Sequence, residues 1–309
     1  MQLNVGNLVT KTKPAGLFLL LITSVAFWWG PLTATFRLAT SNEAYTYILL
    51  IVPLSVGLIL FDNRRPAAAS PESSTLLGAI LLGSAFLLRI CIAWNPWQLS
   101  ASENLSIGMA SLVIWWIGSV ILCLGLDAFR FFRFPLFLLF LIVPMPELTL
   151  AWVTNFLQQQ SAAAASMLFH LIGVPVAREG VVLSIPGLNI EVAQECSSIR
   201  SSTVLVVMAL VMAHLFVRSN WRKALLVLAS IPLSVLKNAI RILVIAELGT
   251  RVNPSFLHGN LHRQGGIVFL ALAVIMLIVL LWILRKSEMQ TAQRNGSDSQ
   301  GNAAASFIQ

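Results

Sequence analysis

The chain has 309 residues, of which 57% are apolar and only 10% are charged. A soluble protein needs about a quarter charged residues to cover its surface, and a disordered chain is poor in apolar residues, so both classes are excluded. The net charge of +8 would suggest a nucleic acid partner in a soluble protein, but here the basic residues lie in short clusters between apolar runs. The sequence therefore predicts an integral membrane protein that binds no nucleic acid.

Apolar runs long enough to cross a bilayer recur along the chain. A hydrocarbon core of about 30 Å needs about 20 apolar residues in a helix. The predicted fold is an all-α polytopic membrane protein with about eight transmembrane helices. We expect them at about residues 15–36, 44–61, 75–94, 107–126, 133–150, 196–217, 223–248 and 265–284.

The basic residues set the predicted orientation, because short cytoplasmic loops collect Lys and Arg. If each run crosses once, one side carries the clusters at 11–13, 64–65, 130–133, 218–223 and 285–294. This side is the predicted cytoplasmic face, and it holds both termini. The opposite loops carry only Arg37, Arg178, Arg251 and Arg263.

The segment 151–195 is predicted to lie outside the membrane. A ninth crossing would move the cluster at 218–223 to the outer side, against the charge rule, and Gln158–Ser161 would be costly in hydrocarbon. We therefore expect an amphipathic helix that lies at the interface, followed by a short hairpin or extended piece around 180–187 between turn residues. Together they form a predicted extracytoplasmic cap over the helix ends.

These expectations divide the chain into four regions. A five-helix membrane region at 1–150, with a cytoplasmic linker at 62–75, precedes the cap. A three-helix region at 196–286 follows the cap, and the polar residues 287–309 are predicted to be a disordered cytoplasmic tail. The two halves of the chain differ, whereas a transporter built from inverted repeats shows two similar halves.

Three reactive side chains reach a common depth in the last three predicted helices. Counted at 1.5 Å per residue from the basic cluster at the inner end of each helix, Cys196 lies at about 33 Å, Arg241 at about 27 Å and His262 at about 34 Å. All three thus reach the predicted outer face. A thiol, a guanidinium and an imidazole at one depth beneath a cap form a candidate active site.

Each of these residues has a chemical role that suits its place. Cys196 opens a predicted helix, whose N-terminal dipole favours the thiolate, as a nucleophile requires. His262 can take up and return a proton near neutral pH, the task of the base in a Cys/His pair. Arg241 keeps its charge, so it would stabilise a developing oxyanion or hold a substrate carbonyl. Together they suggest acyl transfer through a thioester.

Other polar residues leave alternatives open. Arg200 lies one turn after Cys196 and could hold the thiolate or a substrate carboxylate, but an ion pair of Glu195 with Arg200 or Lys237 would fix the helix ends equally well. His258 lies four residues before His262, so both can share a helical face. A metal would suit such a pair, yet no HExxH pattern or third clustered ligand accompanies it.

We accordingly expect no metal and no cofactor, since no phosphate-binding loop or CxxC pair occurs. Cys91 and Cys123 lie inside apolar runs and are interpreted as small hydrophobic residues. Arg89 lies within the third predicted helix, where it is interpreted as a structural residue.

Three motifs in this order resemble those of the exosortase and archaeosortase family of multi-pass membrane cysteine transpeptidases. Gly173–Gly180 and Ile190–Arg200 look like the family's run through an A-C-S-G-[LI]-R signature. Asn238–Arg241 matches its N-x-x-R motif, and His262, with Gly four residues later, matches its third motif. The likeness covers about residues 130–284.

The resemblance implies that Cys196 is the nucleophile, Arg241 the essential arginine and His262 the third catalytic residue. It implies a substrate with a C-terminal sorting tail of the PEP-CTERM kind, made of a short Pro-containing motif, a transmembrane helix and a basic cluster. Such an enzyme would cut exported proteins near the motif and pass the new carboxyl end to an acceptor. It would lie in the inner membrane of bacteria that often make exopolysaccharide, with its active site at the extracytoplasmic face.

Two other functions compete with a membrane thiol transpeptidase. One is a transporter or exopolysaccharide-export partner without peptidase activity, whose cap and polar helix ends form a binding site. The other is plain proteolysis, in which water replaces the acceptor and the same thioester forms. A transporter typically has polar groups near the midplane, whereas the charges of this chain concentrate at the predicted outer ends.

Overall fold

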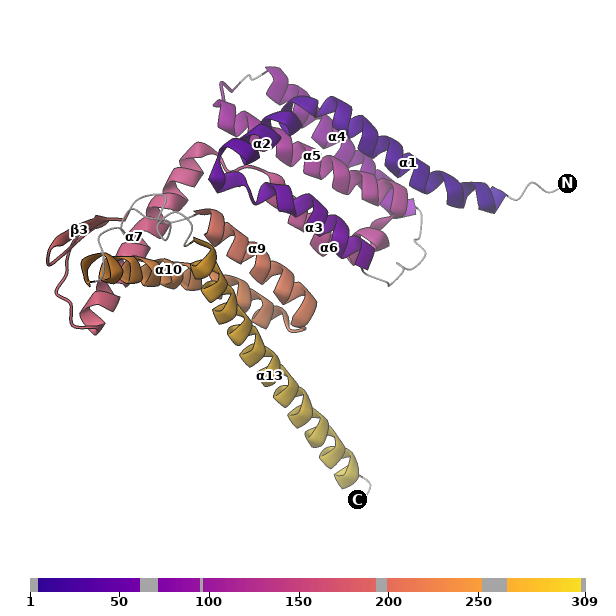
Figure 1. Ribbon diagram of the computed structural model, residues 1–309. Helices are drawn as coiled ribbons and strands as arrows, with labels where there is room; N and C mark the ends of the chain where they lie inside the picture. Colours follow the sequence, from indigo (N-terminus) through magenta and orange to yellow (C-terminus); the bar gives the residue numbers. More distant parts are fainter. Residues whose placement is uncertain (1–4, 62–71, 95–96, 193–198, 252–265, 307–309) are drawn as a thin grey trace. The chain divides into compact units, whose positions relative to one another are not determined.

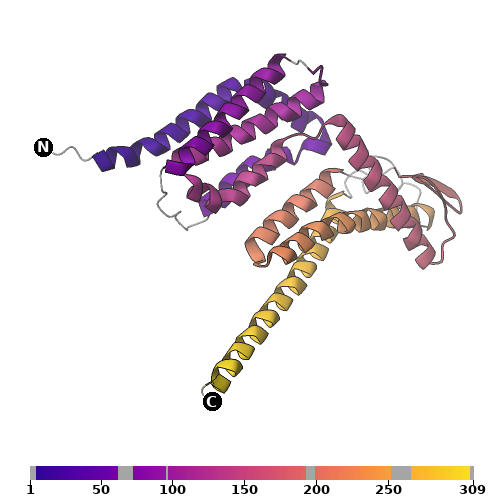
Figure 2. The same ribbon diagram turned by 180° about the vertical axis from the view of Figure 1, so that it is seen from behind.

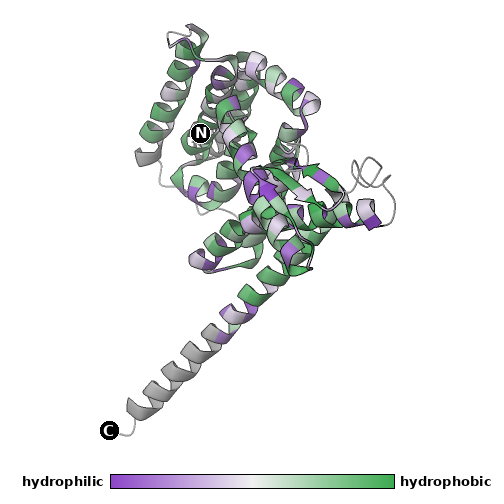
Figure 3. Cartoon of the chain, turned by 90° about the vertical axis from the view of Figure 1, so that its left-hand side faces the viewer, coloured by the Kyte–Doolittle hydropathy of each residue, from purple (hydrophilic) through white to green (hydrophobic). Residues whose placement is uncertain are grey.

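The computed structural model describes residues 5–61, 72–94, 97–192, 199–251 and 266–306 (Figure 1). The chain divides into two compact units, Met1–Ala151 and Trp152–Gln309. Apolar residues dominate the helices of both units (Figure 3). The predicted class, an all-α polytopic membrane protein, is confirmed: in these described ranges six helices are long and apolar enough to span a membrane, and two bent pairs bring the number to as many as eight.

The first unit consists of helices in the part of it that the structure describes. Helix α5 starts at Ala101, six residues before the predicted start, because Ser100 and Glu103 form a capping box: the Ser100 hydroxyl accepts the Glu103 N–H, and the Glu103 carboxylate accepts the Ser100 N–H at 2.9 Å. The predicted linker at 62–75 lies mostly outside the described residues. The elements are α1 (Val5–Phe27), α2 (Trp29–Ser41), η1 (Glu43–Tyr45), α3 (Ile48–Phe61), α4 (Glu72–Trp94), α5 (Ala101–Leu124), α6 (Leu126–Leu138) and η2 (Leu139–Ile142).

Helices α4 and α5 pack closely along their lengths because glycines line their contact. A Cβ atom on Gly78 would lie 2.7 Å from the backbone nitrogen of Leu122, and one on Gly118 would lie 3.1 Å from Leu81 Cβ. Small residues let the backbones of membrane helices approach in this way. Nearer the start of α5, the buried indole of Trp28 donates a hydrogen bond to Ser111 at 2.8 Å.

Two of the eight predicted spans are bent. The first, at 15–36, is the pair Ala15–Phe27 and Trp29–Ser41, which meet at 72°. The fifth, predicted as one helix at 133–150, is wrong in that form: Leu126–Ile142 and Glu147–Leu171 meet at 96° across a break of four residues. The break contains Pro144 and Pro146, which donate no backbone hydrogen bond and push the preceding residue out of the helical region.

Neighbouring side chains satisfy the backbone that this break exposes. The Ser106 hydroxyl donates to the carbonyl oxygen of Pro144 at 2.7 Å, and the Tyr45 hydroxyl donates to the carbonyl oxygen of Met145 at 2.8 Å. A helix can be interrupted in a membrane protein only where protein groups replace the lost hydrogen bonds. Side chains of the first unit thus stabilise this break in the helix.

The second unit begins with the predicted cap. Helix α7 spans Glu147–Leu171, and a three-stranded antiparallel sheet follows it in the order β1 (Ala177–Glu179), β2 (Val182–Ile185) and β3 (Leu188–Glu191). A helix and a hairpin occur where the sequence predicts them, and strand β1 adds a third strand that was not predicted. The interfacial position of α7 stays a prediction. Gly180 (φ 62°) and Gly187 (φ 84°) lie in the two tight turns, where a positive φ favours glycine.

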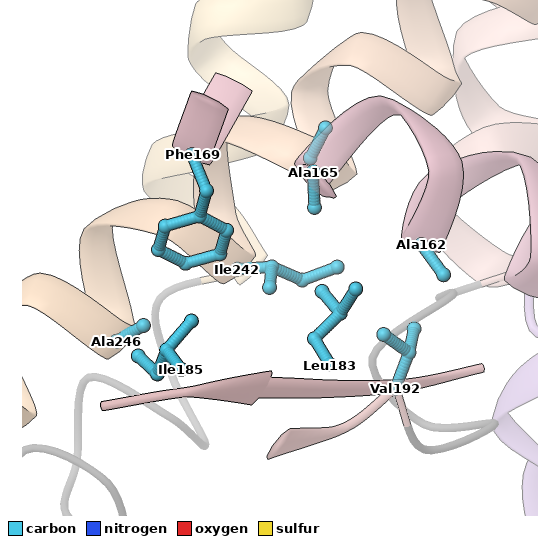
Figure 4. Close-up of a cluster of buried hydrophobic side chains, with 9 residues drawn as sticks. Ala162, Ala165, Phe169, Leu183, Ile185, Val192, Ile242 and Ala246 are labelled. Atoms are coloured by element: carbon cyan, nitrogen blue, oxygen red, sulfur yellow. The ribbon is translucent and has the colours of Figure 1, made fainter. Parts of the chain in front are cut away.

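An apolar cluster, here called the cap cluster, joins α7 and the sheet to helix α10 (Asn220–Arg251) (Figure 4). The α7 residues recur at the spacing of one helical face, and Leu183 and Ile185 point from one face of β2. The cluster thereby fixes the cap against the second half of α10. Its buried members are Ala162, Ala165, Phe169, Leu183, Ile185, Val192, Ala239, Ile242 and Ala246.

Phe169 is the largest side chain of the cap cluster and is fully buried. We expect Phe169→Ala to destabilise the second unit by about 3–5 kcal/mol, because it leaves a cavity between α7, the sheet and α10. Thermal unfolding in detergent measures this as a lower midpoint. Met167→Ala is the matched control, since Met167 is 70% exposed on the same helix. Equal midpoints for the two variants would contradict the packing described here.

Helices α9 (Ile199–Phe216), α10 and α13 (Gly266–Ser306) complete the second unit, and α9 and α10 run side by side in both views (Figures 1 and 2). Apolar residues of α13 at Ala273, Leu277 and Leu281 form one stripe that packs on α9 and α10. Helix α13 continues to Ser306, into the segment 287–309 for which a disordered tail is predicted. The apolar first half of α13 nucleates the helix, and no proline interrupts residues 287–306 that follow it.

Candidate active site

Helix α10 carries a stripe of buried polar side chains. Lys237, Asn238 and Arg241 are only 2%, 1% and 7% exposed, and Ser230 and Ser234 are also buried. The spacing of these five residues follows the helical period, so they lie on one face of α10. We call them the polar stripe. A polar face on an apolar membrane span packs against other protein groups, because exposing it to lipid hydrocarbon is costly.

The first turn of α9 supplies hydroxyl partners to this stripe. The Lys237 ammonium donates a hydrogen bond to the Ser201 hydroxyl, and the hydroxyls of Ser202 and Ser234 share another. Ser201 and Ser202 are themselves buried. The N-terminal turn of α9 therefore lies against the middle of the polar stripe.

Helix α7 contributes to the same region from the cap. The Asn238 side-chain amide donates to the Ser161 hydroxyl at 3.3 Å, and the Gln158 amide donates to the backbone carbonyl of Val192. The sequence predicts that Gln158 and Ser161 are costly in hydrocarbon. The structure instead buries both among protein groups that satisfy them. Val192 directly follows strand β3, so its contacts with α7 and α10 hold the end of the sheet against these two helices.

The predicted site residues divide into two groups. Arg241 and Asn238 are buried on α10, and Arg200 is exposed as the second residue of α9. Cys196, Glu195, His258 and His262 lie outside the described residues. The structure therefore brings Asn238 of the N-x-x-R motif to a hydroxyl of α7, and the neighbouring Lys237 and Ser234 to hydroxyls of α9. The catalytic roles remain predictions.

Lys237 is a residue whose importance the sequence analysis missed. It was considered only as an ion-pair partner of Glu195, although a lysine within an apolar span, one turn before Arg241, is itself a signal of function. Within the described part of the chain, its hydrogen-bond partner is Ser201 and no acidic side chain forms an ion pair with it.

Lys237 and Arg241 place two buried cations one turn apart in this region. Burying a charge is costly unless it is paired and hydrogen-bonded. The partial positive charge of the α9 N-terminus, beside Ser201, adds to the same field. Such a region stabilises a negative charge on a bound group, whether a carboxylate or the oxyanion of an acyl-transfer intermediate.

The remaining candidates lie apart from the polar stripe. Cys91 is an exposed free thiol and Cys123 a partly buried one. The Arg89 guanidinium lies over the Phe27 ring, 5.8 Å from its centroid. Among the described residues no group of three or more His, Cys, Asp or Glu side chains could hold a metal ion. The predicted absence of a metal stays a prediction, because His258 and His262 lie outside the described residues.

Comparison with known proteins assigns the family. A family model described as transmembrane exosortase matches residues 28–279, which include both α9 and α10. No curated protein and no solved structure matches the chain. The match extends well beyond the three motifs, into the helices of the first unit. The chain therefore belongs to the transmembrane exosortase family.

Proposed function

We propose that this exosortase is a cysteine transpeptidase that removes the C-terminal sorting tail of exported proteins. One observation of the structure supports this most: Arg241 of the N-x-x-R motif is buried in the polar stripe, one turn after Lys237, which donates a hydrogen bond to Ser201 in the first turn of α9. A guanidinium held in a low-dielectric site acts strongly on charge that develops there.

In the proposed reaction the Cys196 thiolate attacks the carbonyl carbon of the scissile peptide bond. Arg241 stabilises the oxyanion that forms. The C–N bond then breaks, His262 gives a proton to the leaving amine, and a thioester to Cys196 remains. An acceptor nucleophile attacks the thioester and gives its proton to His262, which restores the thiolate and places the acceptor on the new carboxyl end.

The charge pattern supports the proposed setting. Basic clusters on one side of the spans assign both termini to the cytoplasm and the site to the extracytoplasmic face of the inner membrane. The substrate's tail would lie beside the helices of the second unit as another transmembrane helix in the lipid. Its sorting motif would then reach the depth of Arg241 and Cys196.

A processing assay tests this function. The protein is expressed in a bacterial membrane together with an exported reporter that ends in a Pro-containing motif, a transmembrane helix and a basic cluster. Intact mass measurement then follows the reporter. We expect a shortened product, whose mass shows whether water or a larger acceptor took the acyl group. A reporter that stays intact beside a well-expressed, folded enzyme would favour a transporter or export partner without peptidase activity.

The third motif leads to a further prediction. We expect His262→Ala to abolish processing of the reporter, because no other base in the motif would give the leaving amine its proton. His258→Ala is the matched control, one turn away, and should keep most of the activity. The opposite result would assign the base to His258.

A further inference from the structure

The polar stripe contains a buried cation that the proposed reaction does not use. The Lys237 side chain is 2% exposed, and its ammonium carries three hydrogen-bond donors. Within the described residues it uses one of them, on the Ser201 hydroxyl. A hydroxyl is neutral, so it satisfies a donor but does not balance the charge.

A second buried cation lies close to Lys237 on the same helix. Arg241 lies one turn further along α10 on the same face and is also buried. The other described partners in the region, Ser161, Ser202 and Ser234, are neutral hydroxyls. A lysine can be buried at this cost where a bound anion supplies the missing charge.

The depth of Lys237 limits where that anion comes from. Lys237 lies 14 residues after Lys223, or about 21 Å along α10, and 14 residues before Arg251. In the predicted orientation, this places Lys237 about one turn below Arg241 and about 9 Å inside the outer edge of a hydrocarbon core of about 30 Å. An anionic group that reaches this depth belongs to a chain that is itself inserted in the membrane, as the tail of the proposed substrate is.

An unmodified peptide carries only carboxylates as anions at neutral pH. We infer that Lys237, oriented by Ser201, binds an acidic side chain of the substrate's membrane-inserted tail, and that Arg241 adds to the positive potential there. This inference rests on the proposed function, because it takes a peptide as the ligand. It adds a specificity-determining residue: a tail with Asp or Glu at the matching depth binds, and its Asn or Gln counterpart binds weakly.

Binding can be tested without any catalysis. The full-length Cys196→Ala protein is purified in detergent, and its thermal unfolding midpoint is titrated with an apolar tail peptide that carries one Glu, or with the same peptide carrying Gln. We expect the Glu peptide to bind at least about 10-fold more tightly, as a hydrogen bond to a charged group provides. This preference should disappear with Lys237→Met added, and persist with Lys223→Met, which removes a lysine from the other end of α10.

The remaining outcomes are also decisive. An equal preference for the Glu peptide in the Lys237→Met and Lys223→Met proteins, both unfolding cooperatively, would overturn the inference. If the Glu peptide binds only after Glu195→Gln is added, the anion of this site is a carboxylate of the chain itself, and the inference is again wrong. Neither result depends on processing, so a failure of the proposed peptidase activity would be seen separately in the reporter assay.

Discussion

Replacing Cys196 with alanine is expected to lower the rate of tail processing by more than about 10⁴-fold, since a missing nucleophile leaves no route to the thioester. Cys196→Ser should be nearly as inactive, because a hydroxyl is a much weaker nucleophile than a thiolate near neutral pH. The rate is measured on the tail-bearing reporter in membranes, by intact mass over time.

The chain supplies its own controls for this experiment. Cys91 and Cys123 are free thiols of the first unit, one exposed and one partly buried. We expect Cys91→Ala and Cys123→Ala to process the reporter at close to the wild-type rate. Wild-type rates in both Cys196 variants would remove the thioester mechanism altogether.

Arg241 is expected to have the second largest effect. Arg241→Gln should lower the processing rate by about 10²–10³-fold, the usual loss when one donor to an oxyanion is removed. Arg241→Lys should recover little of it, because a lysine lacks the planar fork of donors that a guanidinium presents to two oxygens. The measurement is the initial rate of reporter processing at equal amounts of enzyme.

Arg251 offers a matched control on the same helix. Its side chain is 68% exposed and pairs with Glu247 at 2.7 Å, so Arg251→Gln should leave the rate almost unchanged. The thermal midpoints of both variants show whether they fold. A folded Arg241→Gln enzyme that works as fast as Arg251→Gln would be incompatible with an electrostatic role for Arg241.

The spans could be predicted from the sequence because hydropathy reports them directly. Helices α9 and α10 begin within a few residues of the expected positions, and the amphipathic α7 with its hairpin was expected between 151 and 195. The bend at Pro144 and Pro146 was missed, because hydropathy remains high across it and only the prolines mark the break. Strand β1 was missed because three exposed residues show no alternation.

The candidate site was predictable only in part. The N-x-x-R motif identified Arg241 and Asn238, and both are buried on α10. A lysine within an apolar span is a signal that the sequence does offer for Lys237, but its partner Ser201 lies 36 residues earlier in the chain. A contact between two helices of this kind follows from tertiary packing, which the pattern of a single span does not reveal.

The account depends most on a covalent bond between Cys196 and the substrate. The direct measurement is mass spectrometry of the wild-type enzyme after acid quench during reporter processing, with peptide mapping of the modified site. We predict that the peptide containing Cys196 gains the mass of the new carboxyl end of the reporter, and that hydroxylamine removes this mass, as it does for a thioester. Processed reporter that accumulates while this peptide stays unmodified, or an adduct on another residue, would contradict the account.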